Sequence, residues 1–195
     1  MIIVIEGCDQ AGKLTQCKLL YQVLRKQNKQ AKIMSFPDYS TSIGKEIRHY
    51  LYGRRKLHPK VIHCLLSANR WEKLSQLIKY NTDNTFLILN RYYQSNLAYG
   101  LAHNLDPTWL QNLDTGLPEP KLVILLHAVD PVKLFRRKNV TNKDRFETNI
   151  KFLIRVSEIY EKLAIQNKWT IINASDTRAN IHNSIIETIK SRGIL

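Results

Sequence analysis

The sequence lacks a hydrophobic run long enough to cross a membrane. A membrane-spanning helix needs roughly 20 consecutive apolar residues, whereas runs such as LVILL (122–126) are much shorter. The apolar residues at 2–5 follow no basic segment and precede no cleavage-site pattern, so they are expected to form a strand and not a signal peptide. These absences argue against a membrane protein and favour the cytoplasm, with the nucleus as the alternative.

Cysteine is scarce as well. The only three are Cys8, Cys17 and Cys64, an odd number without the spacing of metal ligands. No disulfide framework is therefore implied, which fits a reducing compartment. Cys8 lies inside a glycine-containing loop, where it is either a reactive thiol or, as we favour, a small buried side chain.

Acidic residues are few compared with basic ones. The chain has 16 Asp and Glu against 30 Lys and Arg, a formal net charge of +14. Such an excess predicts an anionic partner, either nucleic acid or a small ligand such as a nucleotide. The basic residues are scattered, with short clusters only at 53–56 and 135–138, and no zinc-finger or RNP-type motif accompanies them. We therefore favour nucleotides and expect no nucleic-acid partner.

Repeats, low-complexity segments and Gly/Ser linkers are also missing, so residues 1–195 are predicted to form a single domain. Short β-rich apolar runs predict strands at 1–6, 32–36, 85–89, 121–127 and 168–173. Helical patterns between them lie at 13–28, 42–52, 58–80, 130–138, 147–166 and 177–192, and Asp106-Pro107 marks the start of a short helix. This alternation predicts an α/β fold with a five-stranded parallel sheet flanked by helices, and ligands at the carboxyl ends of its strands.

The stretch GCDQAGKLT (7–15) has the spacing of a phosphate-binding loop and lies between the first strand and the first helix. Gly7 and Gly12 permit backbone angles that side chains forbid, which turns N–H groups toward phosphate oxygens. The helix that starts near Lys13 adds its positive end, and Lys13 supplies a cation. A simple tight turn is the alternative, which we consider much weaker.

Leu14 stands where such loops carry a Ser or Thr that binds Mg²⁺. Leucine can neither ligate a metal nor donate a hydrogen bond. Thr15 still offers a hydroxyl, but about 100° further round the helix. Phosphate binding is therefore expected to survive, with one metal contact weakened.

Six segments in chain order together resemble the thymidylate kinase family, in its eukaryotic form. They are EGCDQAGKLTQ (6–16), FPDYSTSIGKEI (36–47), SANRWE (67–72), NRYYQSNLAYG (90–100), GLPEPKLVILL (116–126) and DRFE (144–147). The resemblance implies a P-loop nucleoside monophosphate kinase fold with a lid at about 137–147. It also implies phosphorylation of dTMP to dTDP with ATP and Mg²⁺, in dTTP biosynthesis, by a homodimer.

The resemblance further implies roles for particular residues. Around ATP these are Gly7, Asp9, Gln10, Ala11, Gly12, Lys13, Leu14, Thr15, Arg137 and Lys138, with segment 174–180 closing the adenine site. Around dTMP they are Asp9, Phe36, Tyr39, Leu51, Leu66, Arg70, Arg91, Asn96, Tyr99 and Phe146. The catalytic set would be Lys13, Asn90, Arg91 and Arg145.

Within the dTMP set, Asp9 would hold the sugar 3′-hydroxyl, Arg70 a thymine carbonyl and Arg91 the phosphate. Tyr99 would stand near the 2′ carbon, and Arg145 would neutralise charge on the transferring phosphoryl group. Plainer alternatives stay open: a loop-capping role for Asp9, a surface helix position for Arg70, and a salt bridge from Arg145 to Glu147 or Glu158.

The sequence also departs from the family pattern. Asn90 replaces an Asp that helps to organise Mg²⁺, so any role of Asn90 toward the metal would be indirect. In the dTMP pocket, Leu66 replaces a stacking Phe, Tyr39 replaces an Arg, and Phe152 replaces a polar residue near the base. Gln10 stands in place of an Arg or Gly, and the lid stretch 138–143 lacks glycine. These departures keep a second hypothesis open, a nucleotide-binding homologue with weakened catalysis.

Overall fold

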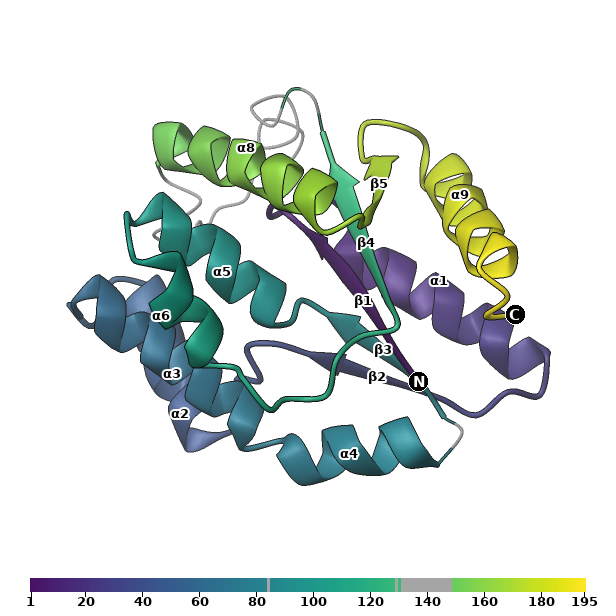
Figure 1. The fold of residues 1–195 in the computed structure, drawn as a ribbon, viewed down its shortest axis with the longest axis horizontal. Helices are drawn as coiled ribbons and strands as arrows, with labels where there is room; N and C mark the ends of the chain where they lie inside the picture. The colour runs from purple at the N-terminus through teal and green to yellow at the C-terminus, as the bar shows by residue number, and fades with distance from the viewer. Residues whose placement is uncertain (84, 129, 131–148) are drawn as a thin grey trace.

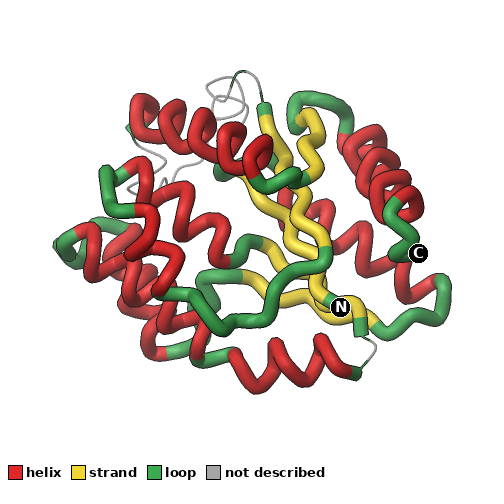
Figure 2. The backbone as a smooth tube through the Cα atoms, in the orientation of Figure 1, coloured by secondary structure: helices red, strands yellow, loops and turns green. Residues whose placement is uncertain are grey.

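The computed structural model describes residues 1–83, 85–128, 130 and 149–195. Its strands are β1 (Ile2–Gly7), β2 (Ala31–Ser35), β3 (Phe86–Asn90), β4 (Leu122–His127) and β5 (Thr170–Asn173). They form one sheet in the order β2-β3-β1-β4-β5, and every neighbouring pair is parallel. The sheet runs through the middle of the molecule between helices (Figure 2). The predicted five-stranded parallel sheet is confirmed.

The helices that surround the sheet are α1 (Lys13–Lys26), α2 (Ser42–Leu51), α3 (Pro59–Trp71), α4 (Leu74–Thr82), α5 (Tyr93–Ala102), α6 (Pro107–Asn112), α8 (Ile150–Gln166) and α9 (Arg178–Ser191). The short helix after Asp106 is confirmed, with the Asp106 side chain accepting a hydrogen bond from the Trp109 N–H at 2.7 Å. Apart from Asp130, the predicted helix 130–138 lies outside the described residues.

Two helix predictions need correction. The single helix expected at 58–80 is two helices, α3 and α4. The end of α3 is tied to a distant loop, because the Trp71 indole donates to the Leu113 carbonyl at 2.8 Å, whereas α4 turns away and buries Leu77 against β3. Helix α5 was not predicted at all. It is buried on several sides and therefore shows no apolar stripe opposite a polar face.

Alternate residues of β1 face opposite sides of the sheet, as the period of a strand requires. Ile3 and Ile5 pack against α1 and α9, whereas Ile2 and Val4 face the other side. On that other side lie α4, α5 and α8, with α2 and α3 beyond α5 (Figure 1). The same alternation turns Glu6, the next polar residue of β1, toward α5 and α8.

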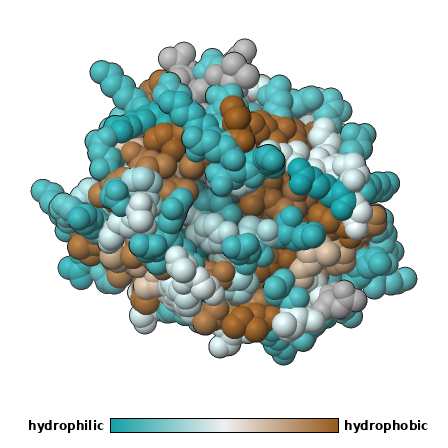
Figure 3. All heavy atoms as spheres, in the orientation of Figure 1, coloured by the Kyte–Doolittle hydropathy of each residue, from teal (hydrophilic) through white to brown (hydrophobic). Residues whose placement is uncertain are grey.

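The parallel arrangement brings the carboxyl ends of the strands to one edge of the sheet. Ile5 of β1 is in register with Asn90 of β3, so the loop that follows β1 lies beside residues 90–92. Hydrophilic side chains are spread over the face seen in Figure 3, with apolar side chains between them. Within the described part of the chain, no helix combines the length and the hydrophobicity that crossing a membrane requires.

Candidate active site

The loop between β1 and α1 requires glycine at two positions. Gly7 has φ 141°, and a Cβ on it would lie only 2.4 Å from the Leu126 carbonyl oxygen of β4. Gly12 has φ 85° and precedes the first residue of α1, where no side chain caps the helix. The first N–H groups of α1 are thus left without a side-chain partner at the positive end of the helix. Such a terminus is suited to bind phosphate.

Lys13 begins α1 and turns back over the loop. Its Nζ donates a hydrogen bond to the Cys8 carbonyl oxygen at 2.7 Å and lies 3.7 Å from Oδ1 of Asp9. Burial and the nearby Arg91 lower the pKa of Lys13 to about 8, although Asp9 partly counteracts them. The Lys13 ammonium group therefore loses its proton at a lower pH than an ordinary lysine does. An anion bound beside it would raise this pKa again.

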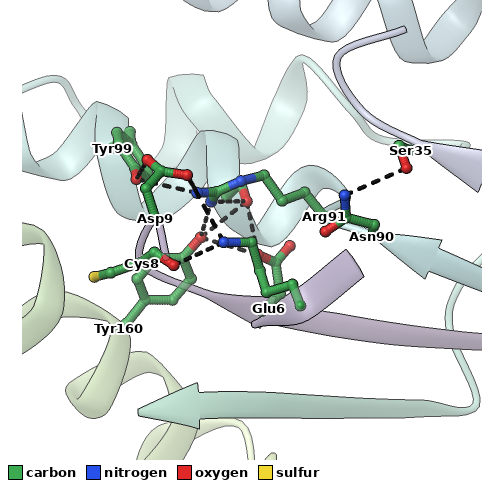
Figure 4. A network of polar contacts seen from close by, with 10 residues as sticks. Glu6, Cys8, Asp9, Ser35, Asn90, Arg91, Tyr99 and Tyr160 are labelled. Atoms are coloured by element: carbon green, nitrogen blue, oxygen red, sulfur yellow. Dashed lines mark hydrogen bonds and ion pairs between the residues drawn. The ribbon is translucent and has the colours of Figure 1, made fainter. Parts of the chain in front are cut away.

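Arg91 is the centre of a second group of contacts at the end of β3 (Figure 4). Its Nη2 lies 2.5 Å from Oδ1 of Asp9 and 3.4 Å from the Tyr99 hydroxyl. Its Nη1 donates to Ser95 Oγ at 3.1 Å and to the Tyr160 hydroxyl at 3.2 Å. Arg91 has φ 67°, in the left-handed region that non-glycine residues rarely adopt. Such outliers are concentrated at functional sites.

Asp9 and Arg91 stabilise each other's charged form. Burial raises the pKa of Asp9, but the positive charges of Arg91 and Lys13 outweigh burial and hold that pKa at about 2. Burial lowers the pKa of Arg91, yet Asp9 keeps the pKa well above its usual range. Lys13 and Arg91 are thus both held beside Asp9, where their N–H groups are already placed to bind an incoming phosphate.

Glu6 is linked to Arg91 through shared hydrogen-bond partners, and our sequence analysis did not predict a role for it. The carboxylate is fully buried and accepts hydrogen bonds from the Tyr92 N–H at 2.8 Å, from Ser95 Oγ at 2.6 Å and from the Tyr160 hydroxyl at 2.9 Å. Ser95 and Tyr160 are therefore bound to both Glu6 and Arg91. The available signal was Glu6 itself, a charged residue inside a strand that is otherwise apolar.

Two polar side chains of the site have buried atoms without a hydrogen-bond partner among the described residues. They are Gln10, at both amide atoms, and Asn90, at Oδ1; the Asn90 Nδ2 donates to Ser35 Oγ at 3.3 Å. An unsatisfied buried polar atom is costly, so these amides are suited to a bound ligand. The described residues contain no group of three or more His, Cys, Asp or Glu side chains that could hold a metal ion. The loop thus fits phosphate, whereas Mg²⁺ would depend on nucleotide and water oxygens.

Leu14 and Thr15 are both exposed on α1, and Ala11 is buried beneath the loop. The Leu14 side chain is 45% exposed and contributes no polar atom. Cys8 is buried, and burial raises its pKa to about 11, so the interpretation as a buried structural thiol is supported over a reactive one.

The residues expected around dTMP converge on one pocket next to Arg91. Of the ten, nine line it: Asp9, Phe36, Tyr39, Leu51, Leu66, Arg70, Arg91, Asn96 and Tyr99. The pocket has about 590 Å³ of empty space, part of it open to solvent. Apolar walls and a few convergent polar groups are typical of small-molecule sites of this size. Phe152 does not line the pocket; its ring stacks on His103 at a centroid distance of 4.7 Å.

Arg70 is not a surface helix residue, so that alternative is wrong. It is only 2% exposed and forms two hydrogen bonds with Asp114, from Nε to Oδ1 at 2.9 Å and from Nη2 to Oδ2 at 2.8 Å. The alternative of Asp9 as a loop cap is not supported either, since its carboxylate contacts the side chains of Arg91, Tyr99 and Lys13.

Four predicted residues lie outside the described part of the chain, namely Arg137, Lys138, Arg145 and Phe146. The segment 174–180 is described; it follows β5 and includes the first residues of α9. Gln16 of α1 donates to the Arg178 carbonyl at 3.0 Å, which places this segment beside the helix that begins at the phosphate loop. Its role toward adenine stays a prediction.

Comparison with known proteins agrees with this geometry. The family model "Thymidylate kinase" matches residues 5–185. The thymidylate kinase of Schizosaccharomyces pombe is 35% identical, over 99% of this chain and 93% of that protein. The thymidylate kinase of Danio rerio is also 35% identical, over 94% and 87%. A solved structure of the Candida albicans thymidylate kinase superposes with a TM-score of 0.88 at 31% identity, over 99% of this chain and 92% of that one. The chain therefore belongs to the thymidylate kinase family.

Proposed function

We propose that this protein transfers the terminal phosphoryl group of ATP to dTMP and forms dTDP and ADP, as a step toward dTTP. The observation that supports this best is the convergence of the nine expected residues on one pocket beside the phosphate loop. The relatives from Schizosaccharomyces pombe and Danio rerio are named thymidylate kinase, and this chain aligns with most of the length of each.

The chemistry needs no general base, because the acceptor phosphate is already a nucleophile. An oxygen of the dTMP phosphate attacks the γ-phosphorus of ATP, and the bond to the β–γ bridging oxygen breaks, so that ADP leaves. The protein contributes by placing two anions in line and neutralising their repulsion. Lys13 and the amides of the loop would bind the donor phosphates, and Arg91 would bind the acceptor phosphate.

In the dTMP site, Asp9 and Tyr99 would contact the sugar, while Phe36, Leu51 and Leu66 would enclose the base. Arg145 and the lid would add positive charge near the transferring group. Mg²⁺, when bound through nucleotide oxygens, would screen the phosphates, and Asn90 would act on the ion only indirectly. We further propose a homodimer, which size-exclusion chromatography with light scattering would test.

The deciding experiment is an ADP-release assay with ATP, Mg²⁺ and each nucleoside monophosphate in turn. We expect dTMP to be the best acceptor. Faster turnover of AMP or GMP than of dTMP would contradict the proposal. The acceptors should be compared fully, since the Candida albicans enzyme is described as having broad substrate specificity.

A second hypothesis, a nucleotide-binding homologue with weakened catalysis, is favoured by Leu14, Asn90 and Leu66. It predicts ATP and dTMP binding in calorimetry with little ADP release. A nucleic-acid-binding protein, the remaining alternative, would instead show DNA binding that falls steeply with salt.

A further inference from the structure

A fully buried ion pair lies where the dTMP pocket meets α3 and the segment after α6. The side chains of Arg70 and Asp114 are 3% and 5% exposed, and they are joined by two parallel hydrogen bonds of 2.9 and 2.8 Å. This two-point geometry fixes the plane of the guanidinium group as well as its position. Because Arg70 also lines the pocket, the pair controls which N–H groups the pocket presents.

Asp114 is itself held in place by neighbouring side chains. Ser67 Oγ, one turn before Arg70 on α3, lies 2.9 Å from Asp114 Oδ1 and 2.8 Å from the Leu113 carbonyl oxygen. The Trp71 indole donates to the same carbonyl oxygen at 2.8 Å. The segment after α6 is thus clamped onto α3 at three points, so Asp114 has little freedom to follow a moving arginine.

The two bonds to Asp114 use Nε and Nη2 of Arg70. Nη1, at the remaining corner of the guanidinium, has no hydrogen-bond partner among the described residues. Arginine carries no acceptor. The edge that Arg70 offers to a ligand is therefore made only of donors, and it can pair only with an acceptor such as a carbonyl oxygen.

We propose that Asp114 is a positioning residue that sets the choice of base: it holds Arg70 so that Nη1 selects a carbonyl oxygen and rejects an exocyclic amino group. The inference rests on the proposed function. An amino group at that place would set donor against donor and leave both buried without a partner. Sites built to hydrogen-bond one group discriminate strongly against an analogue that cannot form the bond.

The test compares dTMP with dCMP as acceptors in Asp114→Asn, a variant that keeps the shape of the side chain and removes its charge. We expect the ratio of kcat/KM for dTMP over dCMP to fall by about tenfold or more. The loss should appear mainly as a higher KM for dTMP, because the contact is on the base and remote from the transferring phosphoryl group. Asp106→Asn is the matched control, an aspartate that caps α6 outside the pocket, and its ratio should be unchanged.

A double-variant cycle separates positioning from general stability. In an Arg70→Gln background, Asp114→Asn should change the ratio no further, because Asp114 acts only through Arg70. Ser67→Ala removes one support of Asp114 and keeps its charge, so it should lower the ratio by a smaller factor. It also decides the question if Asp114→Asn does not fold.

An unchanged ratio in Asp114→Asn and Ser67→Ala, accompanied only by lower thermal stability, would overturn the inference. So would a ratio that Asp114→Asn lowers equally with and without Arg70. Both outcomes presuppose a parent enzyme that prefers dTMP. A parent that prefers another acceptor refutes the proposed function itself, and the two failures are thereby distinguished.

Discussion

Lys13 and Arg91 both contact the carboxylate of Asp9, at 3.7 Å and 2.5 Å. Each cation is buried, so water screens its charge only weakly, and the carboxylates of Asp9 and Glu6 hold both cations in place. A site of this kind attracts a phosphate without needing to create charge when the phosphate arrives. The residue-level predictions follow from that balance.

Replacing Lys13 with Ala should remove nearly all turnover and leave the fold intact. Loss of a cation that acts on the transferring phosphates is expected to lower kcat by about 10²–10³-fold, as for other preorganised donors. Steady-state kinetics and circular dichroism would measure the two effects. The control is Lys18→Ala, an exposed lysine on the same helix. A folded Lys13→Ala protein with full activity would show that the loop does not bind the reacting phosphates.

The pKa of Lys13, lowered to about 8 by burial and by Arg91, predicts a pH dependence. Above that pH the free protein loses the Lys13 proton, and binding ATP must put it back. Without Mg²⁺, ATP affinity should therefore fall above pH 8 by up to about tenfold per pH unit. Calorimetry would measure this fall in affinity, and in Lys13→Met the curve should be flat in this range.

The same pKa shift affects stability. The ordinary pKa of lysine is 10.5, so between pH 8 and pH 10.5 Lys13 takes up a proton when the protein unfolds. The contribution of Lys13 to the free energy of unfolding should therefore rise with pH in this range.

The loop between β1 and α1 is the element that depends most on its glycines. Gly7→Ala combines φ 141° with a Cβ placed 2.4 Å from the Leu126 carbonyl oxygen. We expect the free energy of unfolding to drop by more than about 3 kcal/mol. Gly53→Ala is the control, because φ is 74° there and nothing lies within 4 Å of the added carbon. It should lose only about 1 kcal/mol in urea denaturation. Equal losses would mean that β4 yields to the new methyl group.

Leu14 and Asn90 belong to two elements, the start of α1 and the end of β3, and we infer from the family pattern that both weaken the binding of Mg²⁺. The proposed enzyme should therefore need an unusually high Mg²⁺ concentration for half-maximal rate. Leu14→Ser should lower that requirement, and adding Asn90→Asp should raise kcat further. The effects need not add, since both act on one ion. Mg²⁺ titrations of the parent, both single variants and the double variant would test this, and four coinciding curves would contradict it.

At the scale of the whole molecule, the active site is a product of the sheet order. β1 lies between β3 and β4, so the phosphate loop after β1 meets Arg91 after β3 along one edge. The helices on that side, α3, α5 and α8, then add Arg70, Tyr99 and Tyr160. A ligand in the pocket therefore bridges elements from much of the chain.

Binding of dTMP should consequently stabilise the whole fold. At 100 times its dissociation constant, dTMP would add about 2.7 kcal/mol to the free energy of unfolding. For a chain of this size, that corresponds to a rise in Tm of roughly 5–10 °C. Arg91→Ala should lose the rise, whereas Arg25→Ala, an exposed arginine on α1, should keep it. An equal rise in Arg91→Ala would show that dTMP does not bind at Arg91.

The sequence by itself determined the features that depend on neighbouring residues. Short β-rich runs separated by helical patterns predicted the five parallel strands, and the GxxxxGK spacing predicted the phosphate loop at Gly7–Lys13. These succeed because a buried strand and a strand-to-helix turn impose their requirements within a few residues. The family followed from six such local segments in order.

Only the tertiary structure decided which charges meet. Glu6 and Tyr160 are 154 residues apart, and Arg70 and Asp114 are 44 apart. The residues next to Glu6 or Asp114 in the sequence do not predict these partners, because a buried carboxylate is stabilised by whichever donors the fold brings within about 3 Å. The break between α3 and α4 was also missed: the two helices pack against different distant parts of the chain, α3 through Trp71 and Leu113, 42 residues apart, and α4 through Leu77 against β3.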